Sequence, residues 1–292
     1  MYSQKRTNDL IESRPTRTPE ALKNRILSVR MNMRSTLPKM NWTFRTVEWS
    51  PKLTTVHNQI NATHFVLPDL PNLYSNSDKS KYLDLIPSQK RIQTISACNH
   101  NEKTLREAIA AGSIEAGGKI LLVGGNEKLN SNNSCCALST TQAAHIIRNE
   151  SDVEMWGVTN PNDEESIHSV HEKIESGISG FITQPLLASR ALSILEAYPR
   201  NNNTTFIAGI AMPKNNRNLQ FWLKLLNQMD LESDPMFKSH MTFFQSPHST
   251  SLEWIRRELQ NLESLANIDG VHFMPINNID DLMSLLPQNS YE

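Results

Sequence analysis

Short apolar runs alternate with amphipathic stretches along most of the chain. Runs of five to nine residues that are mostly apolar or rich in β-forming residues, ended by Gly, Pro or polar residues, predict strands. The nearly uniform apolar runs among them predict burial on both faces. The predicted strands cover residues 43–49, 64–68, 91–98, 119–125, 153–159, 180–186, 204–212 and 270–276. Helical periodicity with capping residues predicts helices between most of them, over residues 53–60, 101–111, 140–149, 164–176, 188–198, 218–229, 251–265 and 279–286.

This alternation predicts an α/β fold of the (β/α)8 TIM-barrel class, formed as a single domain by residues 41–292. An open doubly wound sheet is the alternative. Its dinucleotide fingerprint is missing, because Gly124-Gly125-Asn126 does not have the spacing that such a turn needs. Residues 69–81, rich in Pro, Ser and Asn, and the polar residues 127–134 are predicted as loops. Residues 241–244 are predicted to lie in a less regular insertion.

The first forty residues differ from the rest, with nine Lys/Arg against three Asp/Glu. They are expected to form an N-terminal extension, partly helical or disordered, with Thr18 and Pro19 at a helix start. A mitochondrial transit peptide is the alternative, although three acidic residues are unusual for one. The expected localisation is therefore cytoplasmic, or mitochondrial if this segment is a targeting signal.

The net charge of −1 argues against a globally basic nucleic-acid binder, and no run approaches the 18 apolar residues of a membrane span. The three cysteines, Cys98, Cys135 and Cys136, make no disulfide framework and stand in no cluster with zinc-ligand spacing. No nucleic-acid, membrane or metal partner is expected.

In a barrel of this class, chemistry gathers at the carboxyl ends of the strands. The polar residues predicted there are Glu48, Thr94, Asn126, Asn160, Gln184, Asn277 and Asn278. Glu48 is the acidic residue of this set, and loss of water beside Trp49 would favour its neutral, proton-donating form. The alternative is a Glu on the outer face of the barrel.

Gln184 offers a donor and an acceptor, which suits the edge of a heterocycle, or else satisfies loop backbone. Lys173 could reach a phosphate from the preceding helix, although a solvated surface Lys is the simpler interpretation. His168 and His171 lie three residues apart, but with no third ligand in view they are interpreted as a structural or solvated pair.

Six segments in order resemble the methylenetetrahydrofolate reductase family of flavin-dependent barrel enzymes. They are Thr46-Val-Glu-Trp-Ser-Pro-Lys52, Ile120-Leu-Leu-Val-Gly-Gly-Asn126, Trp156-Gly-Val-Thr-Asn-Pro161, the stretch from Lys173 to Gln184 with Gly177 and Phe-Ile-Thr-Gln, Ala208-Gly-Ile-Ala-Met-Pro213 and Gly270-Val-His-Phe273. The resemblance covers about residues 42–278, and the match from Lys173 to Gln184 is the closest of the six.

The resemblance implies FAD-dependent reduction of 5,10-methylenetetrahydrofolate to 5-methyltetrahydrofolate, with NADH or NADPH as hydride donor. It places Glu48 as the proton donor and Gln184 against the folate or nicotinamide. Thr94, Gly125, Asn126, Asn160 and Lys173 would contact FAD. A homo-oligomer is among the expected assemblies, and an appended S-adenosylmethionine-binding regulatory domain is not expected.

The chain departs from the family pattern at three proposed flavin contacts, in Pro185-Leu-Leu-Ala188 after Gln184, and in the second strand, which lacks the family's Thr-rich end. Asn126 stands where the family has an aspartate, Thr94 where it has a histidine, and Gly124 where it has an arginine. Two alternatives to the reductase therefore stay open. One is a catalytically degenerate barrel that acts as a binding or partner subunit, and the other is a barrel enzyme that works without flavin.

Overall fold

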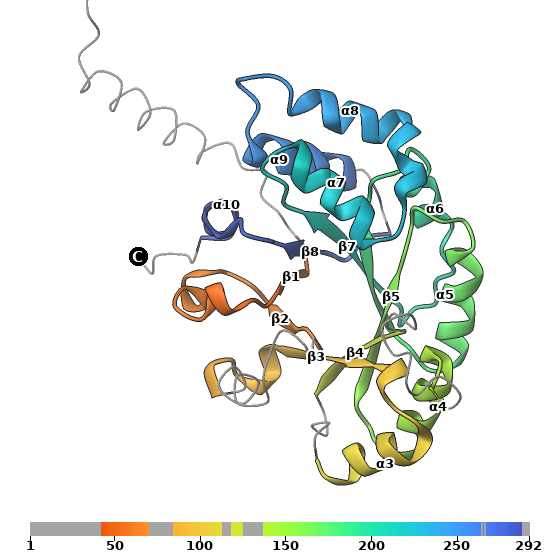
Figure 1. Cartoon of the computed structure of the whole chain (residues 1–292). Coiled ribbons are helices and arrows are strands. Elements are labelled where there is room, and N and C mark those ends of the chain that lie inside the picture. Colours follow the sequence, from red (N-terminus) through yellow and green to blue (C-terminus); the bar gives the residue numbers. More distant parts are fainter. Residues whose placement is uncertain are drawn as a thin grey trace, which may run out of the picture. The chain divides into compact units, whose positions relative to one another are not determined.

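Eight parallel strands close into a barrel in sequence order, from β1 to β8 (Figure 1). The computed structural model describes residues 42–69, 84–112, 118–124, 137–263, 265 and 267–287. Strand β1 pairs with β2 on one side and with β8 on the other, both in parallel. The predicted (β/α)8 TIM barrel is therefore confirmed.

The eight strands lie close to their predicted positions. They are β1 (Phe44–Glu48), β2 (His64–Leu67), β3 (Arg91–Ser96), β4 (Lys119–Val123), β5 (Glu154–Thr159), β6 (Gly180–Pro185), β7 (Thr205–Ala211) and β8 (Gly270–Met274). The described α-helices are α3 (Glu102–Ala110), α4 (Thr140–Glu150), α5 (Ser166–Glu175), α6 (Ala191–Ala197), α7 (Asn216–Leu225), α8 (Pro235–Phe243), α9 (Ser251–Glu263) and α10 (Ile279–Leu285).

Alternate residues of each strand fill the barrel interior. Phe44 of β1 contacts Trp156 of β5 from the opposite wall, with ring centroids 5.5 Å apart, and His64 of β2 lies beside both. The interior cluster consists of Val66, Ile92, Leu121, Trp156, Ile182 and Ile207. Gly180 makes room for the indole, since a Cβ there would lie 2.5 Å from the Trp156 ring. This layering fixes which residues face inward at the mouth.

The amino-terminal end of the barrel is closed by charge and ring contacts. Lys119 of β4 pairs with Glu154 of β5, and the Trp156 indole N–H donates to Glu154 Oε1 at 2.6 Å. Burial and the nearby Lys119 charge lower the pKa of His64. These groups stabilise the end of the barrel opposite the strand carboxyl ends.

The helices begin where the sequence offers caps. Asn101 and Ser139 form capping boxes with Thr104 and Gln142, and the Asn215 side chain accepts from the Asn218 N–H. The predicted helix over residues 53–60 is wrong: two short 3-10 turns, Pro51–Leu53 and His57–Gln59, take its place. The β-branched run from Thr54 to Val56 disfavours a continuous helix there.

Residues 241–243, expected in a less regular insertion, form the last turn of α8. Asp234 caps this helix by accepting from the Met236 and Phe237 N–H groups, and Pro235 occupies its first turn. The predicted loop 127–134 and most of the predicted loop 69–81 lie outside the described residues.

An insertion follows β7 before the chain returns to the barrel. It consists of α7, the 3-10 segment η6 (Met229–Ser233) and α8, while α9 is the helix that packs on β7 (Figure 1). Phe221, Leu225 and Met229, spaced by four residues, are exposed on this insertion. In the described part of the chain, every helix is too short or too polar to cross a membrane.

Candidate functional site at the barrel mouth

Glu48 and His272 meet at the mouth of the barrel, on neighbouring strands β1 and β8. Glu48 faces inward because it alternates with Phe44 and Thr46, and His272 is the register partner of Thr46. Glu48 Oε2 lies 3.9 Å from His272 Nε2. The Glu48 side chain is 39% exposed and that of His272 3% exposed, so only the carboxylate can meet a ligand directly.

Thr46 holds the other side of the imidazole. Its Oγ1 lies 2.8 Å from His272 Nδ1, and Thr46 is fully buried. If the hydroxyl donates to Nδ1, the ring proton sits on Nε2 and points toward Glu48. At 3.9 Å the imidazole lies close enough to orient the Glu48 carboxyl group by electrostatic attraction, without a direct hydrogen bond to it.

Sequence reasoning missed the contribution of His272, because residues 48 and 272 lie at opposite ends of the barrel sequence. The sequence did hold a usable signal. Side chains alternate along a strand, so His272 is predicted to face the barrel interior, and the last strand of a closed barrel pairs with the first. The proposed desolvation of Glu48 by Trp49 is wrong. Trp49 packs on His57 and Phe65, at ring centroid distances of 5.7 Å, and successive strand residues face opposite sides.

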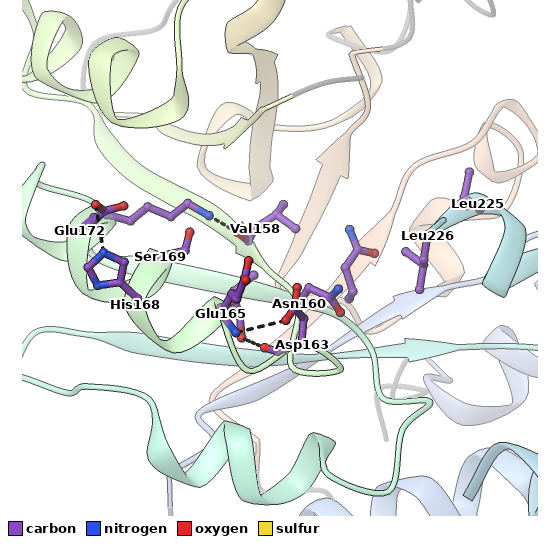
Figure 2. A pocket seen from close by; sticks show the side chains of 13 residues that line it. Val158, Asn160, Asp163, Glu165, His168, Ser169, Glu172, Leu225 and Leu226 are labelled. Atoms are coloured by element: carbon purple, nitrogen blue, oxygen red, sulfur yellow. Dashed lines mark hydrogen bonds and ion pairs between the residues drawn. The ribbon is translucent and has the colours of Figure 1, made fainter. Parts of the chain in front are cut away.

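A second feature of the mouth is an open pocket of about 790 Å³ beside β5, β6 and α5. It brings together three of the predicted site residues, Asn160, Lys173 and Gln184. Figure 2 shows the α5 side chains on one side, Leu225 and Leu226 on the other, and Asn160 between them. The described residues that line the pocket are Val158, Thr159, Asn160, Asp163, Glu165, Ser166, His168, Ser169, Glu172, Lys173, Gln184, Leu225 and Leu226.

Gln184 lines this pocket from an irregular point of β6. The register between β6 and β7 shifts between Ile182 and Pro185, and Thr183 bridges the irregularity. The Thr183 hydroxyl donates to the Gln184 carbonyl at 2.9 Å and accepts from the Gly209 N–H at 2.8 Å. Within the described residues the Gln184 side chain makes no hydrogen bond, so its amide is available to a ligand.

Asn160 and Lys173 are partly engaged by the protein itself. The Asn160 side-chain oxygen accepts from the Asn162 side chain at 2.9 Å. Lys173 Nζ donates to the Val158 carbonyl at 2.8 Å, and burial lowers the pKa of Lys173. The Lys173 side chain is therefore not the solvated surface group of the simpler interpretation.

Asn162 is a buried residue that sequence reasoning did not single out. Its Oδ1 accepts from the Leu187 and Ala188 N–H groups, at 2.7 and 2.9 Å, and its Nδ2 donates to the Pro185 carbonyl at 2.8 Å. Asn162 therefore connects the loop after β5 to the loop after β6 by hydrogen bonds. These hydrogen bonds fix the positions of Asn160 and Gln184 relative to each other.

Other predicted residues lie elsewhere. Thr94 lies within β3, on the inward side with Ile92, and does not line the pocket. Gly125 and Asn126 lie outside the described residues. Asn277 accepts from Lys52 at the surface, whereas Asn278 is buried and donates to the Met212 carbonyl and to Ser251. Asn278 is therefore structural, since it joins the ends of β7 and β8.

His168 and His171 each face a glutamate one turn along α5, Glu172 at 3.4 Å and Glu175 at 3.5 Å. Across the described residues, no group of three or more His, Cys, Asp or Glu could hold a metal ion. The His168–Glu172 pair borders the open pocket, and the His171–Glu175 pair lies outside it on the solvated face of α5.

The charges of the pocket bear on the flavin that the family resemblance implies. Its described lining holds three carboxylates, Asp163, Glu165 and Glu172, against the single ammonium group of Lys173. A diphosphate needs cations or free backbone N–H groups. The part of the lining that the structure describes therefore does not fit the diphosphate of FAD.

No protein-family model and no curated protein matches this chain. Among solved structures, it is similar to an uncharacterized protein from Clostridium thermocellum that binds two copies of 5-methyl-5,6,7,8-tetrahydrofolic acid. That similarity has a TM-score of 0.57 at 18% identity, over 89% of this chain and 97% of the other. A candidate phosphonomutase from Burkholderia cenocepacia J2315 has a TM-score of 0.45 at 9% identity, over 88% and 96% of the two chains. The first similarity shows the barrel fold, and the second carries no argument.

Proposed function

We propose that this chain binds a reduced folate at the mouth of its barrel. The observation that carries the proposal is Gln184, whose side-chain amide lines the mouth pocket without a partner among the described residues. An amide presents one donor and one acceptor side by side, which matches the paired edge of a pterin ring. The similarity in fold to a protein that binds 5-methyl-5,6,7,8-tetrahydrofolic acid supports this ligand class.

Glu48 is the group that exchanges a proton with the ligand. Its carboxylate is the exposed member of the Glu48–His272 pair, while His272 and Thr46 are buried behind it. His272 acts as a positioning residue, because it contacts Glu48 rather than the open mouth. A carboxyl group held in this way suits general acid catalysis on a ring nitrogen.

Flavin-dependent reduction of a methylene folate by NADH or NADPH is the finer proposal, and it follows from the resemblance to the methylenetetrahydrofolate reductase family. Its support is the position of Glu48, inward-facing at the carboxyl end of β1. The acidic lining beside α5 weighs against FAD. A folate-binding barrel without this catalysis is the alternative, and the same residues would then serve binding alone.

Folate binding is tested by calorimetric titration of the full chain with 5-methyltetrahydrofolate. We expect saturable binding by the native protein and about a tenfold loss of affinity in Gln184→Leu, which removes a bidentate contact. Glu175→Gln is the matched control, because Glu175 lies on α5 outside the pocket lining. Equal affinity of Gln184→Leu and native protein would refute the proposed site, and no binding would refute the ligand class.

The reduction is tested separately, by anaerobic mixing with methylenetetrahydrofolate, added FAD and either reduced nicotinamide. If the chain is a reductase, Glu48→Gln loses at least about a hundredfold in rate, as expected for removal of a general acid. Native protein that binds folate but gives no turnover under these conditions would leave the binding proposal standing and remove the reductase.

A further inference from the structure

The pocket beside α5 carries an excess of negative charge where a phosphate-bearing cofactor would lie. Asp163 and Glu165 line it at the start of the helix and Glu172 further along. His168, the remaining titratable group of the lining, has its Nε2 atom 3.4 Å from Glu172 Oε1 and is thus turned toward that carboxylate (Figure 2). Phosphate oxygens would meet like charges on this wall.

Lys173 carries the one ammonium group among the described lining residues, and this group already donates a hydrogen bond within the protein. Lys173 Nζ donates to the Val158 carbonyl at 2.8 Å, and burial lowers the pKa of Lys173. A phosphate would have to draw Nζ away from this carbonyl and leave the oxygen of Val158 without that donor. Breaking a protein contact in this way reduces what the ion pair can contribute.

The amino-terminal end of α5 is also occupied. Free N–H groups at a helix start ordinarily form a ready site for a phosphate. Here Asp163 Oδ1 accepts from the Glu165 N–H at 3.1 Å, and the Ser166 hydroxyl donates to the Asp163 carbonyl at 2.5 Å. The protein's own carboxylate takes the place of an external anion.

The opposite wall of the pocket is apolar. Leu225 and Leu226, at the end of α7, line it across from α5 (Figure 2). Leu225 is 56% exposed and continues the stripe of Phe221 and Met229 on the same insertion. An uncharged flat ring can cover such side chains and still reach Asn160 and Gln184 with its polar edge.

We propose that this pocket binds flat heterocyclic rings without phosphate and selects against the same rings when they carry a phosphate or diphosphate. The inference concerns the α5 side of the mouth and does not depend on folate binding. It also means that a dinucleotide such as FAD binds this barrel weakly, whereas its phosphate-free ring system binds better.

The test uses riboflavin, FMN and FAD as probes, which share one ring and differ in phosphate. Binding to the full chain is followed by quenching of flavin fluorescence at low and high salt. We expect affinity to fall from riboflavin to FMN to FAD, with FAD weaker by about tenfold at low salt. Salt should strengthen FAD binding and leave riboflavin unchanged, because it screens repulsion between exposed charges.

The double variant Glu165→Gln/Glu172→Gln removes two of the three carboxylates without changing side-chain volume. It should bind FAD about tenfold more tightly and riboflavin as before. Glu175→Gln is the control on the same helix, since its side chain faces His171 instead of the pocket. It should change neither affinity.

Two results would overturn the inference: FAD binding at least as tightly as riboflavin to the native protein, or no detectable binding of riboflavin. A titration with 5-methyltetrahydrofolate on the same samples separates this outcome from the proposed function. Folate binding with tight FAD binding would refute the selectivity alone, while loss of folate binding with the expected flavin order would refute the proposed function alone.

Discussion

Two Glu–His pairs in this protein have the same separation and opposite chemistry. In the mouth pair, Glu48 and His272, and in the buried pair, Glu258 and His240, a carboxylate oxygen lies 3.9 Å from an imidazole nitrogen. The mouth pair has a carboxylate that is 39% exposed. The buried pair, between α8 and α9, has both side chains nearly sealed, at 9% and 11% exposed.

The difference lies in the imidazole nitrogen that the carboxylate meets. In the mouth pair, Thr46 takes Nδ1 and Glu48 faces the other nitrogen, Nε2. In the buried pair, Glu258 faces Nδ1, which already accepts a hydrogen bond from the Trp254 indole N–H at 3.1 Å. An accepting nitrogen carries no proton, so His240 cannot donate to Glu258 there.

Burial drives the two members of the buried pair toward their neutral forms. It lowers the pKa of His240 to about 4, with the Arg257 charge acting in the same direction. It raises the pKa of Glu258 to about 7, although Arg257 acts against this shift. A separation of 3.9 Å therefore does not by itself make an ion pair, and the two pairs differ in exposure and in the imidazole nitrogen that faces the carboxylate.

The largest expected effect on the pH dependence of the free energy of unfolding comes from the Glu258→Gln variant. The native carboxyl is protonated in the folded state up to about pH 7 but only to about 4.5 when unfolded. Its stabilising contribution is thus full below pH 4.5 and lost as pH rises to 7. Relative to native protein, the variant should gain about 3 kcal/mol in free energy of unfolding between pH 4.5 and 8.

Chemical denaturation at both pH values measures this gain, and Glu263→Gln at the exposed end of α9 is the control. A constant difference between native protein and Glu258→Gln at all pH values would show that the Glu258 carboxyl has the same pKa in the folded and unfolded states.

The His240→Gln variant should change the free energy of unfolding at the acidic end of the pH range. Glutamine keeps an acceptor for Trp254 but does not titrate. The folded imidazole has a pKa of about 4 against 6.5 when unfolded, so its contribution is full above pH 6.5 and lost as pH falls to 4. The variant should gain about 3 kcal/mol over native protein between pH 7 and 4. A gain in the alkaline range instead would contradict the neutral buried pair.

The strand and helix order was predictable because it rests on local chemistry. Uniformly apolar runs such as residues 119–123 mark doubly buried strands, and Asn101 and Ser139 mark helix starts. The segment from Thr54 to Val56 was mispredicted because apolar spacing alone does not separate one helical turn from a 3-10 turn. The cap at Asp234-Pro235 was present in the sequence and marks α8.

The site was predictable where strand ends decide it. Asn160 and Gln184 follow from their places on β5 and β6, and Lys173 from its position on the intervening helix. The acidic character of the pocket and the role of His272 were not predictable in this way. They depend on the turn of Asp163 back onto α5 and on the closure of β8 against β1.

The Thr46→Val variant probes the hydrogen bond that holds His272 in the mouth pair. Valine has nearly the shape of threonine but leaves His272 Nδ1 without its hydroxyl partner at 2.8 Å. The expected loss in free energy of unfolding is about 1 kcal/mol, the usual cost of one buried hydrogen bond. Thr46→Ser keeps the hydroxyl and should retain the ligand affinity that Thr46→Val loses. Identical folate affinity in the two variants would show that Thr46 does not position His272.

The smallest effect on stability is expected for Glu48→Gln, the same substitution as in Glu258→Gln at the same distance from a histidine. Because the Glu48 side chain is 39% exposed, the free energy of unfolding at pH 7 should change by less than about 0.5 kcal/mol. If Glu48 exchanges a proton with the ligand as proposed, affinity for 5-methyltetrahydrofolate should nevertheless fall. The comparison separates the two pairs by function: one glutamate governs stability with little effect on binding, and the other governs binding with little effect on stability. A large loss of stability in Glu48→Gln would place the mouth pair in the same structural role as the buried one.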